Sequence, residues 1–386
     1  GGMRTVCDVA GGTLFIREGV VTAGSAIALK GKGTVARPFS PDREGDVSLS
    51  LAATPLDTLF TAFVNLLPSG LQEASAAGDV AADGRVHMAH KQALFDCVVS
   101  LHKAGLEIAS QKISVTDMTG TIPFSLDITG AAAAGRPEKR RYSRDTYPAL
   151  VAALRRTAET GQTFTIGGVR FGGIEFGKTS LAIRAGNGLM EITSLESALF
   201  DGTLLGEGFF RYGNKMEYGA DLTVNNLSLR TLCNANPKIK GYISGRVDGI
   251  VSLYGEGKGM NGLRGFTEIW TRSAPGEKML VSKEFLQKLA GRKFKGLFFR
   301  DDRPYDRGEI RGYLENGYLT FDTLDISHTN IFGIKDLSVT VAPVQNRISL
   351  GHLYTSIREA ATRGKAVGGG EGPSAPPEET EFKWEE

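Results

Sequence analysis

Apolar and polar residues alternate along much of this chain, and this alternation constrains the fold more than any other feature of the sequence. Between residues 45 and 53, three aliphatic residues fall on one side of an extended chain and polar residues on the other. The same period of two returns at residues 215–225, 238–253 and 335–341. Such segments form strands with a single apolar face. The aliphatic positions on these faces are Val47, Leu49, Leu51, Leu222, Val224, Ile243, Val247, Val251, Leu337, Val339 and Val341.

Glycine supports the prediction of a strand-rich fold. The sequence holds 50 glycines among 386 residues, about twice the average share, and only 14 prolines. This content suits many tight turns between strands. The pairs Asn187-Gly188, Asp201-Gly202 and Asn316-Gly317 have the composition of two-residue hairpin turns. We therefore expect a mostly antiparallel arrangement of hairpins.

Only a few helices are expected between the strands. The first is predicted over residues 55–67 and the second over residues 144–160, with shorter ones at 229–233, 283–290 and 353–362. The predicted apolar side of the second helix is formed by Tyr147, Leu150, Val151, Leu154 and Ala158. Helices this few cannot cover both faces of a parallel sheet, which again favours an antiparallel fold.

The sequence also contains an internal repeat. Each copy consists of a strand, its hairpin partner, one helical segment and a further strand with interspersed glycines. The matching segments are 31–35 with 206–210, 45–51 with 219–224, 55–59 with 227–232, and 84–88 with 249–253, and a partial third copy lies at 308–321. Because both copies predict the same elements in the same order, we expect the chain to use one structural unit at least twice.

These features divide the chain into four parts. Residues 1–130 are expected to form a first β-repeat with the helix at 55–67. Residues 131–162 combine a basic linker with the second helix, and residues 163–363 form a second β-repeat with a terminal region. The acidic, glycine- and proline-containing residues 364–386 are expected to be disordered.

Catalysis finds little support, and we expect neither enzyme activity nor a metal or cofactor. Residues 257–262 match the G-x-G-x-x-G spacing, but a strand-like segment follows where a nucleotide site needs a helix. His87 and His90 would lie on opposite faces of a strand. The three cysteines are far apart, which excludes a disulfide scaffold and a zinc-finger-like site.

Charge and hydropathy exclude further classes of function. Lysine and arginine total 45 against 43 acidic residues, a balance that argues against a nucleic-acid partner. No apolar run is long enough to span a bilayer, and the first residues do not resemble a signal peptide. Because those residues read as strand material, we expect the chain to be the C-terminal piece of a longer protein.

The aliphatic faces have two interpretations that alternation cannot separate. They can bury one another in a closed sandwich, or they can line an open trough for acyl chains. The basic residues Arg136, Lys139, Arg140 and Arg141 are likewise open to two interpretations. They can contact anionic phospholipid headgroups or simply be solvated in a loop.

Two segments carry a family resemblance. Residues 200–208 read Phe-Asp-Gly-Thr-Leu-Leu-Gly-Glu-Gly, and residues 241–253 read Gly-Tyr-Ile-Ser-Gly-Arg-Val-Asp-Gly-Ile-Val-Ser-Leu. With the short Leu-x-x-Leu helix between them, they resemble the C-terminal regions of AsmA-like proteins, a group that includes the TamB and YdbH relatives. Residues 281–291 and 317–321 are similar to the terminal region of that family. The resemblance covers most of residues 1–364.

The resemblance implies elongated, curved antiparallel sheets that form an open hydrophobic groove. It implies a periplasmic location in a Gram-negative envelope, and an N-terminal inner-membrane anchor that is missing from this chain. Its expected partner is a phospholipid or other acyl lipid, carried between the inner and outer membranes, and other envelope proteins are further candidates. The eleven aliphatic positions would line the groove, and the four basic residues would contact headgroups or the membrane surface.

Two other functions remain open at this stage. One is a structural or interaction module that recruits an envelope protein through exposed strand edges. The other, ranked last, is an enzyme acting on envelope polysaccharide through carboxylates that the fold brings together.

Overall fold

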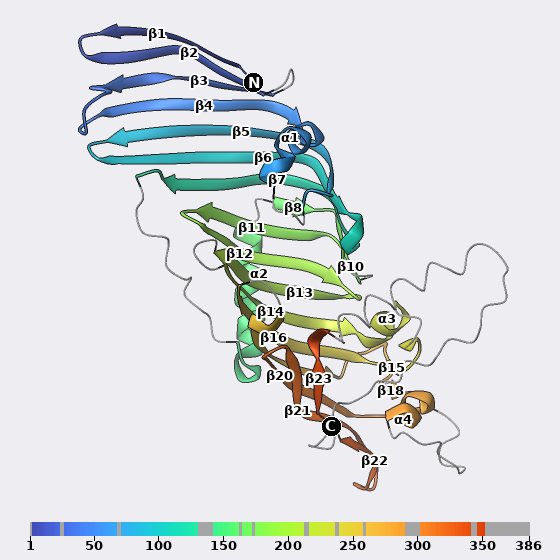
Figure 1. Ribbon diagram of the computed structural model, residues 1–386. Coiled ribbons are helices and arrows are strands. Elements are labelled where there is room, and N and C mark those ends of the chain that lie inside the picture. Colours follow the sequence, from blue (N-terminus) through green and yellow to red (C-terminus); the bar gives the residue numbers. More distant parts are fainter. Residues whose placement is uncertain are drawn as a thin grey trace, which may run out of the picture.

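The computed structural model describes residues 2–23, 27–67, 71–129, 142–161, 164–171, 174–211, 216–235, 239–257, 260–289, 302–340 and 346–351. Within these residues, a single 20-stranded sheet extends from one end of the molecule to the other (Figure 1). The sheet is long, almost entirely antiparallel and not closed into a barrel, and few short helices accompany it. The predicted fold class, mostly β with an elongated, open antiparallel sheet, is confirmed.

The first seven strands form a meander in which each strand pairs with the next. They are β1 (Gly2–Ala10), β2 (Thr13–Ala23), β3 (Ile27–Ala36), β4 (Glu44–Pro55), β5 (Ser75–Ala89), β6 (Gln92–Ile108) and β7 (Ile113–Asp127). Helix α1 (Leu56–Phe63) and the 3-10 turn η1 (Val64–Leu66) follow β4, and α1 contacts β5. The 3-10 turn η3 (Ala109–Gln111) joins β6 to β7.

A second meander continues the sheet toward the C-terminus. Its strands are β11 (Thr179–Gly186), β12 (Leu189–Leu199), β13 (Gly202–Arg211), β14 (Glu217–Ser228), β16 (Arg246–Glu256), β17 (Leu263–Arg272), β20 (Arg307–Glu315) and β21 (Tyr318–Thr329). The last two strands, β22 (Lys335–Thr340) and β23 (Arg347–Ser349), pair with opposite ends of β21.

The two meanders meet at a short junction. Strand β11 runs parallel to β7 over two residue pairs, Ala185 with Phe124 and Gly186 with Ser125. Three short strands complete the junction: β8 (Phe164–Ile166), β9 (Gly168–Phe171) and β10 (Ile174–Phe176). Strand β8 pairs with both β7 and β11, so the sheet is continuous across the junction.

The remaining elements lie around the second meander. Helix α2 (Tyr147–Gly161), preceded by the 3-10 turn η4 (Arg144–Thr146), confirms the predicted second helix. The others are α3 (Leu229–Asn234), η6 (Met260–Gly262), α4 (Lys283–Leu289) and a small sheet of β15 (Ile243–Ser244), β18 (Leu280–Val281) and β19 (Arg303–Pro304). The Ser228 hydroxyl caps α3 by accepting a hydrogen bond from the Thr231 amide at 3.1 Å.

The structure bears out the internal repeat. In the described residues, the order β3, β4, α1, β5 returns as β13, β14, α3, β16, with the 3-10 turn η1 added in the first copy and the two-residue strand β15 in the second. A register shift interrupts each hairpin partner shortly before its helix, between Leu51 and Thr54 in β4 and between Val224 and Leu227 in β14. The third, partial copy is the β20–β21 hairpin.

Two local predictions were wrong. The strand expected over residues 238–253 is divided at Gly245, whose φ of 129° redirects the chain between β15 and β16. The turn between β12 and β13 uses Phe200 and Asp201, both with positive φ, where Asp201-Gly202 was expected. The basic linker, the helix at 353–362 and the acidic tail lie outside the described residues.

Candidate functional site

The ladders of the first meander align its apolar residues on one face. Leu51 lies opposite Leu29 on one side and Ala82 on the other, and Val47 lies opposite Gly33 and Val86. Residues directly opposite in a ladder project from the same face. The larger residues on this face, which we call the aliphatic face, are Met3, Val9, Leu14, Ile16, Val21, Leu29, Val35, Val47, Leu49, Leu51, Val86, Phe95, Val99, Ile122, Phe124 and Leu126.

The other face of the same strands is largely polar. Asp46 accepts a hydrogen bond from Arg85 Nε at 2.9 Å and lies 3.1 Å from His87 Nδ1. These two neighbours, Arg85 first, lower the pKa of the Asp46 carboxyl. The Ser125 hydroxyl donates to Asp96 at 2.7 Å. The first meander therefore has one polar and one aliphatic surface.

The aliphatic face of the first meander remains accessible in the part of the chain that the structure describes. The three buried hydrophobic clusters of the described residues contain no buried residue from strands β1 to β6. Leu49, Phe95 and Phe124 are only half-buried, and Met3 and Val9 at the margin are 77% and 73% exposed. An ordinary sandwich would bury these side chains completely.

The second meander continues the pattern. Leu222 lies between Gly206 and Val251 in the ladders, and Val224 lies between Leu204 and Gly249. Leu222, Val224 and Val251 are half-buried.

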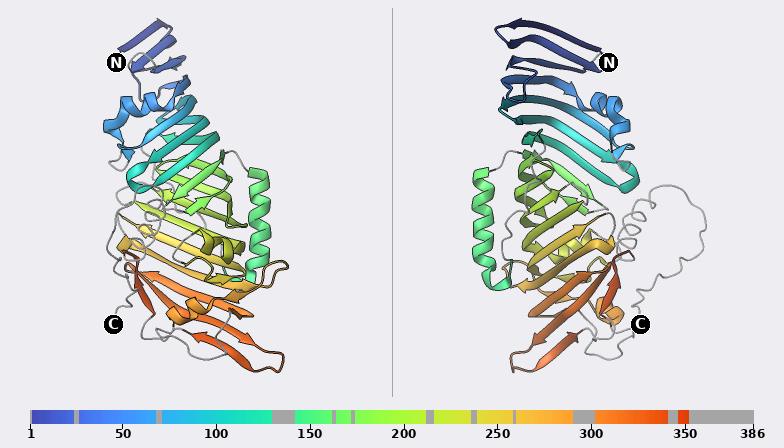
Figure 2. Two further views of the ribbon diagram at one scale, coloured as in Figure 1. Left: turned by 90° about the vertical axis from the view of Figure 1, so that its right-hand side faces the viewer. Right: turned by 60° about the vertical axis from the view of Figure 1, so that its left-hand side comes forward.

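Helix α2 packs on the opposite face of this second meander. Its Leu150, Val151 and Leu154 form a buried cluster with Leu205 and Ile250, which have no exposed surface. Thr223, also fully buried, pairs with both of these strand residues in the ladders, so all three project away from Leu222 and Val224. Figure 2 shows α2 lying along one side of the sheet. The helix thus covers the less aliphatic face.

An ion-pair cluster holds the beginning of α2 against the sheet. Arg144 lies 3.3 Å from Glu309 and 3.8 Å from Glu268, and its guanidinium lies 4.9 Å from the centre of the Trp270 ring. Glu309 also bonds Arg307 at 2.9 Å. Arg307, followed by Arg144, lowers the pKa of the Glu309 carboxyl.

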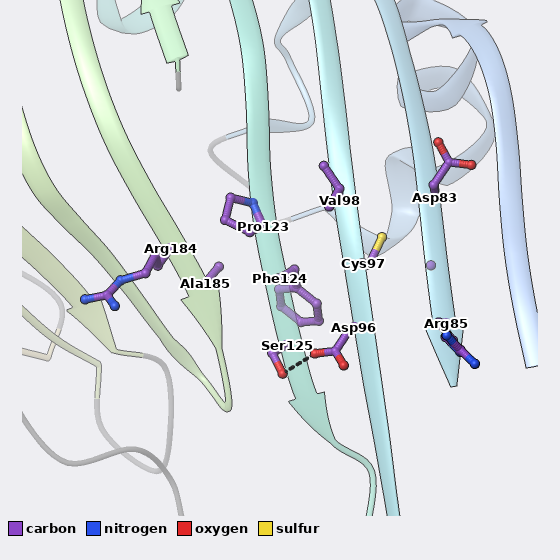
Figure 3. A pocket seen from close by; sticks show the side chains of 11 residues that line it. Asp83, Arg85, Asp96, Cys97, Val98, Pro123, Phe124, Ser125, Arg184 and Ala185 are labelled. Carbon is purple, nitrogen blue, oxygen red and sulfur yellow. Dashed lines mark hydrogen bonds between the residues drawn. The ribbon is translucent and has the colours of Figure 1, made fainter. Parts of the chain in front are cut away.

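The aliphatic face is continuous across the junction of the two meanders. Leu101 and Ile122 from the first meander pack against a buried cluster of Phe164, Ile166, Leu181 and Ile183. The opposite face near the junction carries a shallow hollow of about 480 Å³, lined mainly by residues of the polar face such as Asp83, Arg85, Asp96, Ser125 and Arg184 (Figure 3). A Cβ atom at position 84 would lie 2.8 Å from the Phe95 ring, so a larger residue there would displace this ring on the aliphatic face.

The structure places the predicted groove residues in two different environments. Val47, Leu49, Leu51, Leu222, Val224, Val247 and Val251 lie on the aliphatic face, although Val247 is buried. Ile243, Leu337 and Val339 instead pack in or against a terminal core with Val281, Leu286 and Tyr305. The prediction that these three line the groove was wrong. Ile243 lies in β15, which leaves the main sheet at Gly245, and Leu337 and Val339 pack in the core that includes α4. Val341, Arg136, Lys139, Arg140 and Arg141 lie outside the described residues.

Several residues of the aliphatic face were not singled out from the sequence. In the first meander these include Leu29, Val86, Phe95 and Phe124. A signal was present in β3, where Ile27, Leu29 and Val35 alternate with polar residues. Gly31 and Gly33 obscured this alternation, because they occupy the aliphatic face but have no apolar side chain.

Chemical sites are not apparent in the described part of the chain. It contains no group of three or more potential metal-ligating side chains, and none of its helices is long and apolar enough to cross a membrane. In the described part of the G-x-G-x-x-G segment, Gly257 has a φ of 74°, and η6 is followed by strand β17, where a nucleotide site needs a helix. His87 and His328 each pair with one carboxylate, Asp46 and Asp336.

No family model, curated protein or solved structure matches the chain.

Proposed function

We propose that this chain is a non-enzymatic lipid-binding and transfer module, in which the aliphatic face shields the acyl chains of a phospholipid. One observation carries the proposal. Helix α2 covers the less aliphatic face of the sheet, while Leu222, Val224 and Val251 remain half-buried on the other; only farther along does α4 pack on that other face, against Ile326 and Leu337, among the described residues. A sheet that served only as a core would be expected to bury its aliphatic face first.

The mechanism is physical. Each CH₂ group that leaves an apolar environment for water costs about 0.8 kcal/mol. A continuous aliphatic surface, accessible from β1 to the junction and extended by the second meander, lowers that cost along the whole path. The charged headgroup stays in solvent beside the sheet. No bond is made or broken, and no cofactor is needed.

The resemblance to AsmA-like proteins supports a cellular setting for this activity. In our proposal the chain acts in the periplasm of a Gram-negative envelope, as part of a longer, inner-membrane-anchored protein, and carries phospholipid between the inner and outer membranes. The long, open shape of the sheet fits a path of that kind.

Mass spectrometry of organic extracts from the purified protein tests the proposal. We expect phospholipid at near-stoichiometric levels, and a loss of at least about tenfold in Leu49→Asp and Leu222→Asp, because a buried carboxylate opposes an acyl chain. Ser48→Asp is the matched control: Ser48 is exposed on the polar face of the same strand, between Lys32 and Arg85 in the ladders. A clean extract from the folded wild-type protein would reject the proposal.

The alternative is a structural or interaction module of an envelope assembly complex. It is favoured by β1, an edge strand in which all nine residues are exposed. Such an edge can accept a strand from another protein. Equal lipid content in Leu49→Asp, Ser48→Asp and the wild type would favour this alternative.

A further inference from the structure

The tip of the β21–β22 hairpin carries the most exposed cluster of large apolar side chains at the C-terminal end of the sheet. Ile331 is 94% exposed, Phe332 80% and Ile334 62%. Figure 1 places β22 at the extremity of the molecule farthest from β1. We propose that this tip, residues 330–334, inserts into the interface of a lipid bilayer and docks this end of the sheet on a membrane.

The backbone of the tip already makes its own hydrogen bonds. The Asn330 side-chain oxygen accepts from the amides of Phe332 and Ile334, both at 3.0 Å. The Asn330 amide donates to the Ile334 carbonyl, and the Gly333 amide donates to the Asn330 carbonyl, both at 2.9 Å. Unpaired backbone groups are what make loops costly in a bilayer. These four amides remove much of that cost.

Charge at the base of the tip is consistent with a phospholipid surface. Lys335 is exposed directly after the tip. The nearby carboxylate of Asp336 is bonded to His328 at 2.5 Å and lies 3.7 Å from Arg303. The exposed cationic Lys335 would then lie at headgroup depth, where basic residues favour anionic lipids.

The small size of the tip favours a bilayer over a protein partner. A stable protein interface needs roughly 800 Å² from each partner and about ten hydrogen bonds. A five-residue tip with an internally bonded backbone offers little of either. Partition into a membrane has no such threshold, because its free energy grows with each apolar side chain that enters.

Vesicle flotation tests the proposal with mixed phosphatidylcholine and phosphatidylglycerol vesicles. We expect the wild-type chain to float with the vesicles, and the triple variant Ile331→Asp, Phe332→Asp, Ile334→Asp to lose on the order of 100-fold in partition coefficient. Folding should be kept, because all three side chains are exposed. Phe39→Asp is the matched control, since Phe39 is a fully exposed aromatic residue in the β3–β4 turn.

A fluorescent variant reports the depth of insertion directly. The emission of the Phe332→Trp variant should shift to the blue with vesicles and be quenched by brominated acyl chains. If the wild type does not float, if the triple variant floats equally well, or if the emission of the Phe332→Trp variant is unchanged by vesicles, the proposal is overturned; in the last case a protein partner becomes the better occupant.

The flotation result can be distinguished from the lipid-content result that tests the proposed groove. The triple tip variant should keep its co-purified lipid, and Leu49→Asp should still float, because the tip and the aliphatic face of the first meander lie far apart (Figure 1).

Discussion

The first and second meanders share one strand pattern but differ in what supports it. In β1–β7 the described residues form a single layer, and α1 contacts β4 and β5 near one end of it. In β11–β17, helix α2 packs on the face opposite the aliphatic face and buries Leu205 and Ile250 completely. The aliphatic face is half-buried at its central positions in both meanders, and it is most exposed at the β1 margin of the first, where Met3 and Val9 lie.

Because of this support by α2, the residues that stabilise the second meander differ in part from those proposed to contact the ligand. The second meander has buried clusters on both faces: α2 packs on the face opposite the proposed groove, and the clusters at the junction and under α4 lie on the groove side. Between those two clusters, Leu222, Val224 and Val251 remain half-buried and contribute less to the core. The first meander has no such core in the described residues, so cross-strand pairs and hydrogen bonds supply more of its stability. Substitutions should therefore affect the two meanders unequally.

The largest expected difference is between two leucine truncations. Leu205→Ala should cost about 2–5 kcal/mol of unfolding free energy, because it leaves a cavity under α2. Leu49→Ala should cost about 1 kcal/mol, since Leu49 is only half-buried. Urea denaturation monitored by fluorescence and by hydrogen exchange of each meander measures both. Similar losses for the two variants would contradict the proposed difference.

A smaller effect is expected at the cluster that holds α2. Glu309→Gln should cost about 1–3 kcal/mol at neutral pH, because buried Glu309 bonds Arg307 and lies near Arg144. The folded-state pKa of Glu309 is lowered from 4.5, so its contribution is complete above about pH 4.5 and is lost as pH falls through the folded value. The variant should therefore lose less stability on acidification than the wild type. Glu175→Gln, in an exposed pair with Arg170, is the control.

Thiol labelling compares accessibility in the two meanders. Cys97 lies on the aliphatic face, and Cys233 is buried at the end of α3. Burial raises the pKa of both thiols, so both should react more slowly with a maleimide than exposed Cys7. Added phospholipid should slow Cys97 several-fold and leave Cys233 unchanged. Peptide mass spectrometry reads each site, and an unprotected Cys97 would place the lipid elsewhere.

The smallest effect is expected on the polar face of the first meander. Asp46→Asn removes an exposed pair with Arg85 and His87, and should change stability by less than about 0.5 kcal/mol. Because the Asp46 pKa is lowered, even this contribution disappears as pH falls below about 3.8. Lipid content should not change. A large loss of lipid in Asp46→Asn would indicate that the ligand contacts the polar face.

Local patterns in the sequence predicted the elements well. The apolar side of α2 was identified correctly: Tyr147, Leu150, Val151, Leu154 and Ala158 are all buried. The Asn187-Gly188 and Asn316-Gly317 turns both have positive φ at the two positions. The physical reason is that helix faces and hairpin turns are determined by residues close together in the chain.

Placement between elements could not be predicted in the same way. Ile243 and Val247 share the period of one strand, yet Gly245 sends them into different sheets. The choice of face by α2 depends on Leu205, Ile250 and Trp270, which are far from the helix in sequence. The exposed tip at Ile331 and Phe332 also escaped notice, since exposure cannot be read from a short apolar run.

The ladder pattern has a consequence for how such a molecule can change in length. Apart from the junction strands, β23 and the two outermost strands, each described main-sheet strand hydrogen-bonds the preceding and following strands of its meander. The sheet is thus a nearly one-dimensional array, in which each hairpin interacts mainly with the two beside it. Inserting or deleting a hairpin would leave distant ladders intact. The length of such a sheet is then adjustable in steps of one hairpin, about 10 Å each.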